Sequence, residues 1–402
     1  MEGNEKFSIY IPDYALAVMD ALWNAGEEVY IVGGCVRDCV LGSKPHDYDM
    51  AVSCPPERTL EILSGFRTVP TGLSHGTVTA ISDRQPIELT TFRVDGSYTD
   101  MRRPDSVSFT RSIAEDLARR DFTVNAMAYC PKTGIIDLFG GIEDAKKGII
   151  RAVGDPEKRF GEDALRIMRA FRFSAQLGFE IDPETAEAAA KCRDGLSRIA
   201  SERICTEFIK LICSPHPEKP LLQMKALGIL PYVTAGYIPD DRIFKLLGLM
   251  PPIDADRLGI FLADADKQTA TAMLSHLKCS NKQKSGAIAI SQNSRVKIRS
   301  PKDATVLRSR IGEYALSAIR ASVLLGENGA EALDIARSDK APCKIADLAL
   351  DGADMIKLGI GGRDIGKALE YLLSRVMYEP ALNTRDSLLA IAKEYVETCE
   401  AH

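Results

Sequence analysis

Long hydrophobic runs are missing from this 402-residue sequence. No apolar stretch reaches the roughly 18 residues that a membrane-spanning helix needs. The N-terminal residues MEGNEKFSIY also lack the charged and then apolar segments of a secretory signal. These absences argue against a membrane partner and predict a cytoplasmic protein. The chain is long enough for about two to four globular domains.

Closely spaced cysteines are missing as well. The ten cysteines are scattered along the chain, and none forms a CxxC motif. Cys35 and Cys39 are one helical turn apart, a spacing that favours packing over metal binding. Cys205 and Cys213 lie in apolar surroundings. We therefore expect reduced, mostly buried thiols and no zinc site.

The sequence also lacks an excess of basic residues. The net charge is −5, whereas nucleic-acid-binding domains are commonly basic. An RNA partner would therefore have to bind local basic patches or a groove lined by helices. The densest patch, His276–Arg310, has many Lys and Arg residues and few acidic ones, which predicts contact with backbone phosphates. A solvated linker is the alternative for this stretch.

The region from Val29 to Val52 carries the clearest positive pattern. It predicts a strand, a glycine turn, a short helix and a second strand. These segments are Val29–Val32, Gly33–Gly34, Cys35–Leu41 and His46–Val52. The turn is not a P-loop, because the region contains no GxxxxGK[ST] motif.

The same region carries groups that suit a phosphate and a metal ion. The backbone amides of Gly33 and Gly34 can approach phosphate oxygens, and Arg37 adds a fixed positive charge. Asp47 and Asp49 are two residues apart on a predicted strand, so their carboxylates share one face. Two adjacent carboxylates repel each other unless a cation lies between them, and hard oxygen ligands suit Mg²⁺. A structural turn with surface carboxylates is the alternative.

Glu88 is a third candidate carboxylate. It lies on the second of two β-prone runs, Gly76–Ile81 and Pro86–Arg93, which a short polar turn joins into a hairpin. A carboxylate across the sheet from Asp47 and Asp49 would complete a two-metal site. A solvent-facing glutamate on a half-buried strand is the alternative.

Two segments follow the hairpin. Val94–Ser108 is polar and aperiodic, which predicts a long mobile loop. Glu115–Tyr129 is expected to be a helix with Arg119, Arg120 and Asp121 as a charged cluster at its centre, a pattern usually found on solvated helix faces. Its expected core residues are Leu117, Phe122, Val124 and Met127.

A long helix is expected from Asp155 to Leu177, with an Asp cap, a proline in the first turn and Gly178 as its stop. One face carries the charged residues Glu162, Asp163, Arg166, Arg169 and Arg172. An Asp can accept from the amino group of C or A, and an Arg one turn later can donate to the neighbouring ring acceptor. U and G present the opposite pattern. A salt-bridged surface stripe, with Asp163 pairing Arg166, is the alternative.

Several of these motifs, in this order, resemble the class II tRNA nucleotidyltransferases (CCA-adding enzymes) and the bacterial poly(A) polymerases, which belong to the DNA polymerase beta superfamily. The motifs are GGxVRD followed by DxD, then DGxYxDxRRPxxV, RRDFTxNA and EDxxRxxRAxRF. They all lie before residue 216, and beyond it the likeness is weaker. The resemblance implies an α+β fold with a small nucleotidyltransferase head containing a mixed β-sheet, followed by an all-α neck, body and tail. The expected bounds are 1–150, 151–215, 216–310 and 311–402, and the tail is expected to bind tRNA.

The resemblance also implies roles in nucleotide binding. Arg120 would contact the nucleotide, and Asp121 and Asn125 would lie near its ribose. Asp163 and Arg166 would act as an amino-acid template for the incoming base.

The resemblance also implies roles for the other charged residues and for the loop. Arg169 and Arg172 would lie towards phosphate or take part in packing. Asp47 and Asp49, together with Glu88, would hold two Mg²⁺ ions. The DGxYxDxRRPxxV loop is linked in the family to the switch from adding C to adding A.

The implied activity is addition of C, C and A to tRNA 3′ ends from CTP and ATP. The alternatives are a bacterial poly(A) polymerase, a partial adder of CC or A alone, and a non-catalytic RNA-binding module. The long loop argues against a CC-only adder, the acidic net charge argues against a poly(A) polymerase, and the intact site motifs argue against a binding module. The one His-Asp pair, His46-Asp47, lies in the metal motif, so no HD phosphohydrolase domain is expected. Nothing in the sequence specifies an oligomeric state.

Overall fold

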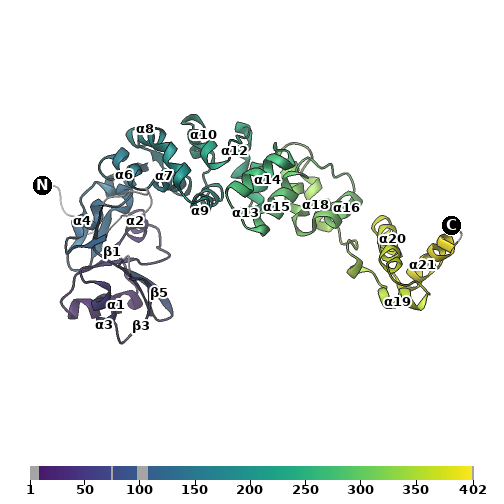
Figure 1. The fold of residues 1–402 in the computed structure, drawn as a ribbon, viewed down its shortest axis with the longest axis horizontal. Coiled ribbons are helices and arrows are strands. Elements are labelled where there is room, and N and C mark those ends of the chain that lie inside the picture. Colours follow the sequence, from purple (N-terminus) through teal and green to yellow (C-terminus); the bar gives the residue numbers. More distant parts are fainter. Residues whose placement is uncertain (1–8, 74–75, 97–106, 401–402) are drawn as a thin grey trace. The chain divides into compact units, whose positions relative to one another are not determined.

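The computed structural model describes residues 9–73, 76–96 and 107–400. The chain forms two compact units (Figure 1). The first unit comprises Met1–Ile238 with His276–Lys278, and the second comprises Pro239–Ser275 with Cys279–His402. The finer division into head, neck, body and tail stays a prediction. No helix in the described ranges is long and apolar enough to span a membrane.

A seven-stranded mixed sheet dominates the start of the first unit. Its strand order is β3-β4-β5-β2-β1-β8-β9. Strands β2 and β5 are parallel, and all other neighbours are antiparallel. The strands are β1 (Val29–Val32), β2 (Met50–Val52), β3 (Arg67–Gly72), β4 (Thr77–Ser82), β5 (Gln85–Thr91), β8 (Met127–Cys130) and β9 (Gly134–Asp137). This sheet, followed by helices, confirms the predicted α+β class.

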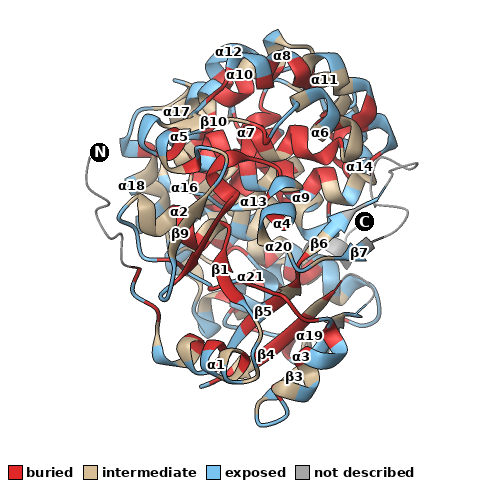
Figure 2. Cartoon of the chain, turned by 90° about the vertical axis from the view of Figure 1, so that its left-hand side faces the viewer, coloured by how far each residue is buried: buried red, intermediate tan, exposed pale blue. Residues whose placement is uncertain are grey.

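The central strands of this sheet are buried on both faces (Figure 2). Successive side chains of a strand point to opposite faces. Accordingly, Val29 and Ile31 of β1 join a core cluster with helices α1 (Asp13–Asn24) and α2 (Gly34–Val40). Tyr30 and Val32 join a second cluster that includes Leu117 of α4 (Ile113–Ala118). The central strands therefore lie between two packed layers of core residues.

The predicted hairpin is confirmed. Strands β4 and β5 pair antiparallel up to Ser82 and Gln85. Asp83 and Arg84 both have positive φ angles, as a two-residue turn requires when its twist matches that of the flanking strands. Strand β3, which continues the sheet beyond β4, was not expected from the sequence.

The helical remainder of the first unit and two small strand pairs complete its fold. The strand pairs are β6 (Arg93–Asp95) with β7 (Val107–Phe109) and β10 (Ile149–Ile150) with β11 (Glu180–Ile181). The helices are α3 (Pro56–Ile62), α5 (Gly141–Lys147), α6 (Pro156–Glu162), α7 (Leu165–Leu177), α8 (Pro183–Cys192), α9 (Ser201–Ile212), α10 (Glu218–Ala226) and α11 (Leu230–Val233). Residues 97–106 of the predicted loop lie outside the described residues.

The expected helix over Glu115–Tyr129 is wrong. Helix α4 ends at Ala118, a short 3₁₀ turn spans Thr123–Asn125, and Met127 starts strand β8. The backbone there is committed to distant partners: Thr123 N–H donates to the carbonyl of Arg151, and Met127 O accepts from Gly33 N–H. These pairings override local helix propensity. The expected core residues Leu117, Phe122, Val124 and Met127 are nevertheless fully buried.

Two other boundaries differ from the expectation. The single helix over Asp155–Leu177 is two helices, because Asp163 has an extended backbone with φ −139° and ψ 102°. Its side chain accepts from Leu165 N–H and so caps the start of α7. The strand expected over His46–Val52 begins only at Met50, so Asp47 and Asp49 precede it.

The second unit is entirely helical over its described residues, with one core cluster around α16 and α17 and another around α20 and α21. Its helices are α12 (Asp241–Leu247), α13 (Asp254–Phe261), α14 (Lys267–His276), α15 (Asn281–Ser291), α16 (Pro301–Ile311), α17 (Ala315–Leu324), α18 (Glu331–Ser338), α19 (Gly352–Lys357), α20 (Asp364–Tyr378) and α21 (Arg385–Glu400).

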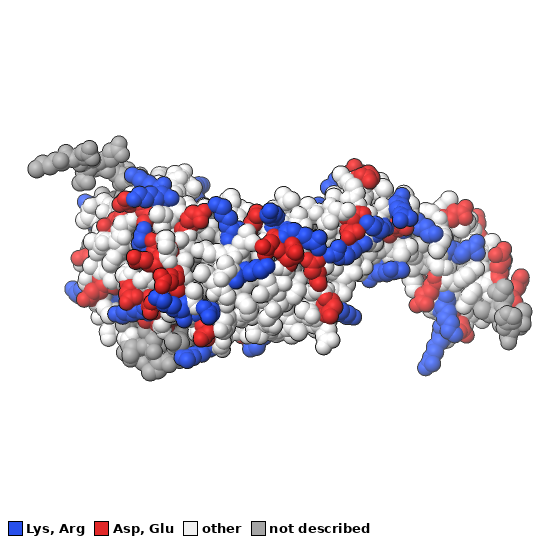
Figure 3. Space-filling view, turned by 90° about the horizontal axis from the view of Figure 1, so that it is seen from above, with Lys and Arg blue, Asp and Glu red and all other residues white. Residues whose placement is uncertain are grey.

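Several bases of the His276–Arg310 stretch pair with acids from elsewhere in the chain. Arg295 contacts Asp264 and Glu327, and Lys297 also contacts Glu327. Figure 3 shows basic and acidic side chains close together over the helical part of the chain. Contact between this stretch and RNA phosphates stays a prediction.

Candidate active site

The glycine turn after β1 brings two guanidinium groups together. Gly33 has a φ of 78°, and a Cβ placed on it would lie 3.2 Å from Nη1 of Arg120. A Cβ on Gly34 would lie 3.5 Å from Nη2 of Arg37. Both arginines therefore lie directly against a backbone that carries no side chains, which leaves the turn open to an anion.

Hydrogen bonds fix Arg37 in place. Its Nη1 donates to Oδ1 of Asn125 at 2.8 Å, and its Nε and Nη2 donate to Asp38. Asn125 in turn donates to Oδ1 of Asp121 at 3.4 Å. Arg169 also binds Asp121, with its Nε 2.7 Å from Oδ2. Although burial opposes it, this guanidinium holds the pKa of Asp121 below its usual range.

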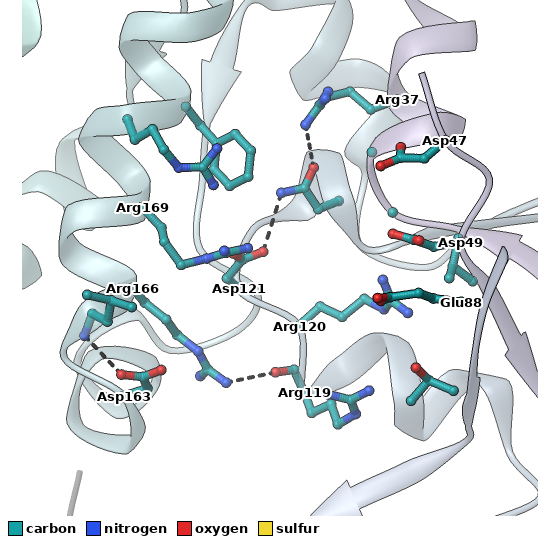
Figure 4. Close-up of a pocket in the computed structure, with 18 of the residues that line it drawn as sticks. Arg37, Asp47, Asp49, Glu88, Arg119, Arg120, Asp121, Asp163, Arg166 and Arg169 are labelled. Atoms are coloured by element: carbon teal, nitrogen blue, oxygen red, sulfur yellow. Dashed lines mark hydrogen bonds and ion pairs between the residues drawn. The ribbon is translucent and has the colours of Figure 1, made fainter. Parts of the chain in front are cut away.

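Three carboxylates lie along one side of the same site (Figure 4). Exposure alternates from Asp47 to Met50, so Asp47 and Asp49 point the same way, as predicted. The carbonyl of Asp49 accepts from Val32 N–H at 3.0 Å. Strand β2 pairs with β5 from Met50 opposite Leu89, and this register brings Asp49 next to Glu88.

The carboxylates repel one another. Asp49 is accessible from the pocket, yet desolvation and the charges of Asp47 and Glu88 raise its pKa to about 6, while Arg120 acts in the opposite direction. Such a cluster of hard oxygen donors fits a divalent cation such as Mg²⁺. No three acidic, His or Cys side chains of the described chain form a complete metal-binding group. Phosphate oxygens and water would have to supply the remaining ligands.

Asp163 and Arg166 lie on the opposite side of the site, at the break between α6 and α7 (Figure 4). The alternative in which they pair with each other is wrong. Oδ2 of Asp163 accepts from Nη2 of Arg203 at 3.0 Å. Arg166 instead binds Oε2 of Glu162 at 2.7 Å and the carbonyls of Arg159 and Arg119 at 3.1 Å. The two side chains are thus held separately, each by its own partner.

Three arginines lie close to the ring of Phe173 in α7. The ring lies 3.8 Å from Cζ of Arg172, 5.3 Å from Cζ of Arg169 and 5.5 Å from Cζ of Arg37. These are cation–π distances. Arg172 also donates through Nε to Glu207 at 2.5 Å. Because Arg37 belongs to α2 and the others to α7, the ring ties α7 to the start of the glycine turn.

Asp116 was not expected from the sequence. It is 1% exposed, and its Oδ1 lies 2.7 Å from Nη2 of Arg119 while its Oδ2 lies 3.0 Å from Nη2 of Arg120. The spacing of three and four residues on a helix was the available signal. Sequence reasoning also missed Arg203, Phe173 and Lys210, for which no comparable signal exists.

All the predicted site residues line a single pocket of about 880 Å³ in the first unit. They are Gly33, Gly34, Arg37, Asp47, Asp49, Glu88, Arg120, Asp121, Asn125, Asp163, Arg166, Arg169 and Arg172. The volume lies in the upper part of the range of about 300–1,000 Å³ that ligand pockets occupy. The structure brings these residues together, while their individual roles stay predictions.

Two family models match parts of the first unit. A family model described as "Poly A polymerase head domain" matches residues 29–151. A second, described as "Probable RNA and SrmB- binding site of polymerase A", matches residues 178–236. These matches cover the sheet, the glycine turn and the helices that follow α7.

Other known proteins are similar to this chain over almost its whole length. The CCA-adding enzyme of Leuconostoc mesenteroides is 38% identical over 402 residues, which cover 95% of this chain and 96% of the relative. The crystal structure of the Bacillus stearothermophilus CCA-adding enzyme in complex with CTP has a TM-score of 0.83 and 31% identity, covering 96% and 98% of the two chains. The Thermotoga maritima CCA-adding enzyme complexed with tRNA shares the fold, with a TM-score of 0.68 and 21% identity over 98% and 97%. The chain therefore belongs to the family of CCA-adding enzymes.

Proposed function

We propose that this protein adds C, C and A to the 3′ end of tRNA, using CTP and ATP and releasing pyrophosphate. One observation carries the proposal: a single pocket joins a carboxylate cluster suited to nucleotidyl transfer with an Asp and an Arg suited to choosing C and A. The names of the relatives, and the CTP bound in one of them, support the same substrates.

The carboxylates would provide the reaction centre. Asp47 and Asp49, with Glu88 beside them, would hold the divalent ions, for which we propose Mg²⁺. When bound, such ions activate the attacking hydroxyl and neutralise the triphosphate and the leaving pyrophosphate. The glycine turn would seat the triphosphate between Arg37 and Arg120, whose guanidinium groups already lie against it.

The base would be chosen by the protein without a nucleic-acid template. A carboxylate accepts a hydrogen bond from the amino group of C or A, and a guanidinium donates to the adjacent ring nitrogen. Asp163 and Arg166 would take these roles. Their separate partners, Arg203 and Glu162, hold each group in position before a nucleotide arrives. With U or G the hydrogen-bonding pattern of the base is reversed. The carboxylate would then face another acceptor, and the guanidinium would face another donor.

We also propose the division into head (1–150), neck (151–215), body (216–310) and tail (311–402). In support, the three carboxylates fall within the head, and Asp163 and Arg166 fall within the neck. We further propose a cytoplasmic location, since tRNA and nucleoside triphosphates are found there.

Primer extension tests the proposal. tRNA ending at the discriminator base, at C and at CC is incubated with each nucleoside triphosphate, and the products are sized. We expect C on the first two primers, A on the third and then arrest. Growth by many A residues would indicate a poly(A) polymerase, and incorporation of C alone or A alone a partial adder. No incorporation, with active controls, would indicate a binding module.

The Asp49→Ala variant tests the reaction centre. We expect it to lose transfer of both nucleotides while still binding them, because the glycine turn and the base-selecting pair remain. Turnover and nucleotide affinity are measured separately. Asp20→Ala, an exposed carboxylate of α1, is the matched control. Retained turnover in Asp49→Ala would contradict the metal-binding assignment.

A further inference from the structure

We infer that Arg203 is a positioning residue for base selection. It acts through Asp163 and sets how sharply the protein distinguishes C and A from U and G. The inference rests on the proposed function, in which the carboxylate of Asp163 accepts a hydrogen bond from the amino group of the base. Arg203 lies on α9 and Asp163 lies at the break before α7, so the two come from separate elements, and both line the pocket.

Both oxygens of the Asp163 carboxylate are held. Oδ1 accepts from the backbone N–H of Leu165 at 3.0 Å, and Oδ2 accepts from Nη2 of Arg203 at 3.0 Å. The first contact is the local cap of α7. The terminal torsion of an Asp side chain has broad energy minima, so this cap alone leaves the plane of the carboxylate poorly fixed. The contact from the second helix fixes that plane, and with it the direction of the lone pairs that remain for a base.

Arg166 would compete for Asp163 if Arg203 were absent. It lies three residues later, a spacing at which acids and bases around a helical turn lie close together. In the structure each of the two has another partner: Oε2 of Glu162 lies 2.7 Å from Nη1 of Arg166, and Arg203 binds Asp163. A carboxylate that paired with Arg166 would turn away from its present direction and would offer fewer lone pairs to the amino group of a base.

A second ion pair ties α9 to α7 and fixes the place from which Arg203 reaches Asp163. Glu207, one turn after Arg203, accepts from Nε of Arg172, and both of these side chains are largely buried. Residues four apart lie on one face of a helix. The face of α9 that contacts α7 therefore carries one base and one acid, each matched to a group of opposite charge.

The guanidinium of Arg203 is not fully satisfied. Among the residues that the structure describes, its Nη1 is buried and has no hydrogen-bond partner. Burying a donor without a partner costs free energy. The side chain therefore holds Asp163 at a cost to stability, which favours a role in orienting this carboxylate over a role in stabilising the fold alone.

Arg203→Ala and Arg203→Met test the inference, because the methionine keeps an apolar stem and removes the charge. The kcat/KM ratios of ATP to GTP and of CTP to UTP are measured on tRNA ending at CC and at the discriminator base, respectively. We expect both ratios to fall by about 3–10-fold, because the carboxylate remains but is no longer held. Arg203→Lys should restore most of each ratio, since the contact is made through Nη2 and an ammonium can also donate it.

Two further variants separate positioning from stability. Ile204→Val changes a buried neighbour on α9 that lies outside the pocket. It should loosen the packing of α9 slightly and leave both ratios unchanged. The double variant of Arg203→Ala and Asp163→Ala should show the ratios of Asp163→Ala alone, because Arg203 acts through that carboxylate. Equilibrium binding of CTP and UTP requires no turnover and should show the same change in ratio.

Unchanged ratios in Arg203→Ala and Arg203→Met would overturn the inference. An equal loss for all four nucleotides, or failure of both variants to fold, would also overturn it, since either result assigns Arg203 to the fold alone. A failure of the proposed function would appear differently, as absent incorporation of C and A by the wild type or as unchanged ratios in Asp163→Ala.

Discussion

Asp116 is a single buried carboxylate that orients two arginines of the pocket. Its two oxygens each bind a different guanidinium, and one of these belongs to Arg120 at the glycine turn. Although burial opposes it, the two guanidinium groups hold the pKa of Asp116 below its usual range. The stabilisation from these pairs is therefore fully present above the ordinary carboxyl pKa and is lost as the pH falls through the depressed value.

Asp116→Asn should misplace Arg120 without removing it. We expect kcat/KM to fall by about 10–100-fold for CTP and ATP alike, because the contact proposed between Arg120 and the triphosphate would be common to both. The free energy of unfolding should fall by about 1.5–3 kcal/mol. Steady-state kinetics and thermal melting measure the two effects. Glu115→Gln, an exposed neighbour on α4, is the control, and unequal losses for the two nucleotides would contradict the assigned role.

Unlike Asp116, the ionised carboxylate of Asp49 destabilises the folded protein, although we propose that it is needed for transfer. Its carboxylate is destabilised by desolvation and by Asp47 and Glu88. In metal-free buffer at neutral pH, Asp49→Asn should therefore stabilise the protein while it abolishes transfer. The gain should be about 1 kcal/mol or less, because solvent screens an accessible charge. Asp20→Asn is the control, and a lower melting temperature of Asp49→Asn would refute the repulsion.

At the scale of elements, periodic patterns and turn residues were predictable from the sequence. The strand at Val29–Val32, the hairpin of β4 and β5 and the helix stop at Gly178 agree with the structure. The break at Asp163 was not predicted from the sequence. It depends on a side-chain cap and on Arg203, which is forty residues away. Local sequence carries no information about such a partner.

Gly141, at the start of α5, tests how closely the elements of the first unit pack. A Cβ there would lie 2.3 Å from the carbonyl oxygen of Thr123 and 2.9 Å from Cγ of Met127. Gly141→Ala should destabilise the protein by about 1–3 kcal/mol or more, as overpacking against backbone does. Thermal and urea unfolding measure this cost.

The matched substitution is Gly65→Ala, where nothing lies within 4 Å of the added Cβ. We expect it to change the free energy of unfolding by no more than about 0.5 kcal/mol. Equal effects of the two substitutions would contradict the close approach of α5 to the turn at Thr123.

At the scale of the whole molecule, the pocket lies entirely in the first unit. We propose that Asp47 and Asp49 account for the transfer of a nucleotide, and Asp163 with Arg166 for the choice of base. The sequence predicted the residues of both groups from their motifs. It could not predict that Phe173 and Lys210 line the pocket, or that Asp116 is buried behind Arg119 and Arg120, since each position depends on tertiary packing.

The most direct test of the account compares base selection in the wild type and in Asp163→Ala. The kcat/KM ratios of ATP to GTP and of CTP to UTP are measured on tRNA ending at CC and at the discriminator base, respectively. We predict that the variant still transfers nucleotides but loses about 1–3 kcal/mol of discrimination, while Asp20→Ala keeps the wild-type ratios. Unchanged ratios in an active Asp163→Ala variant would contradict selection by this side chain.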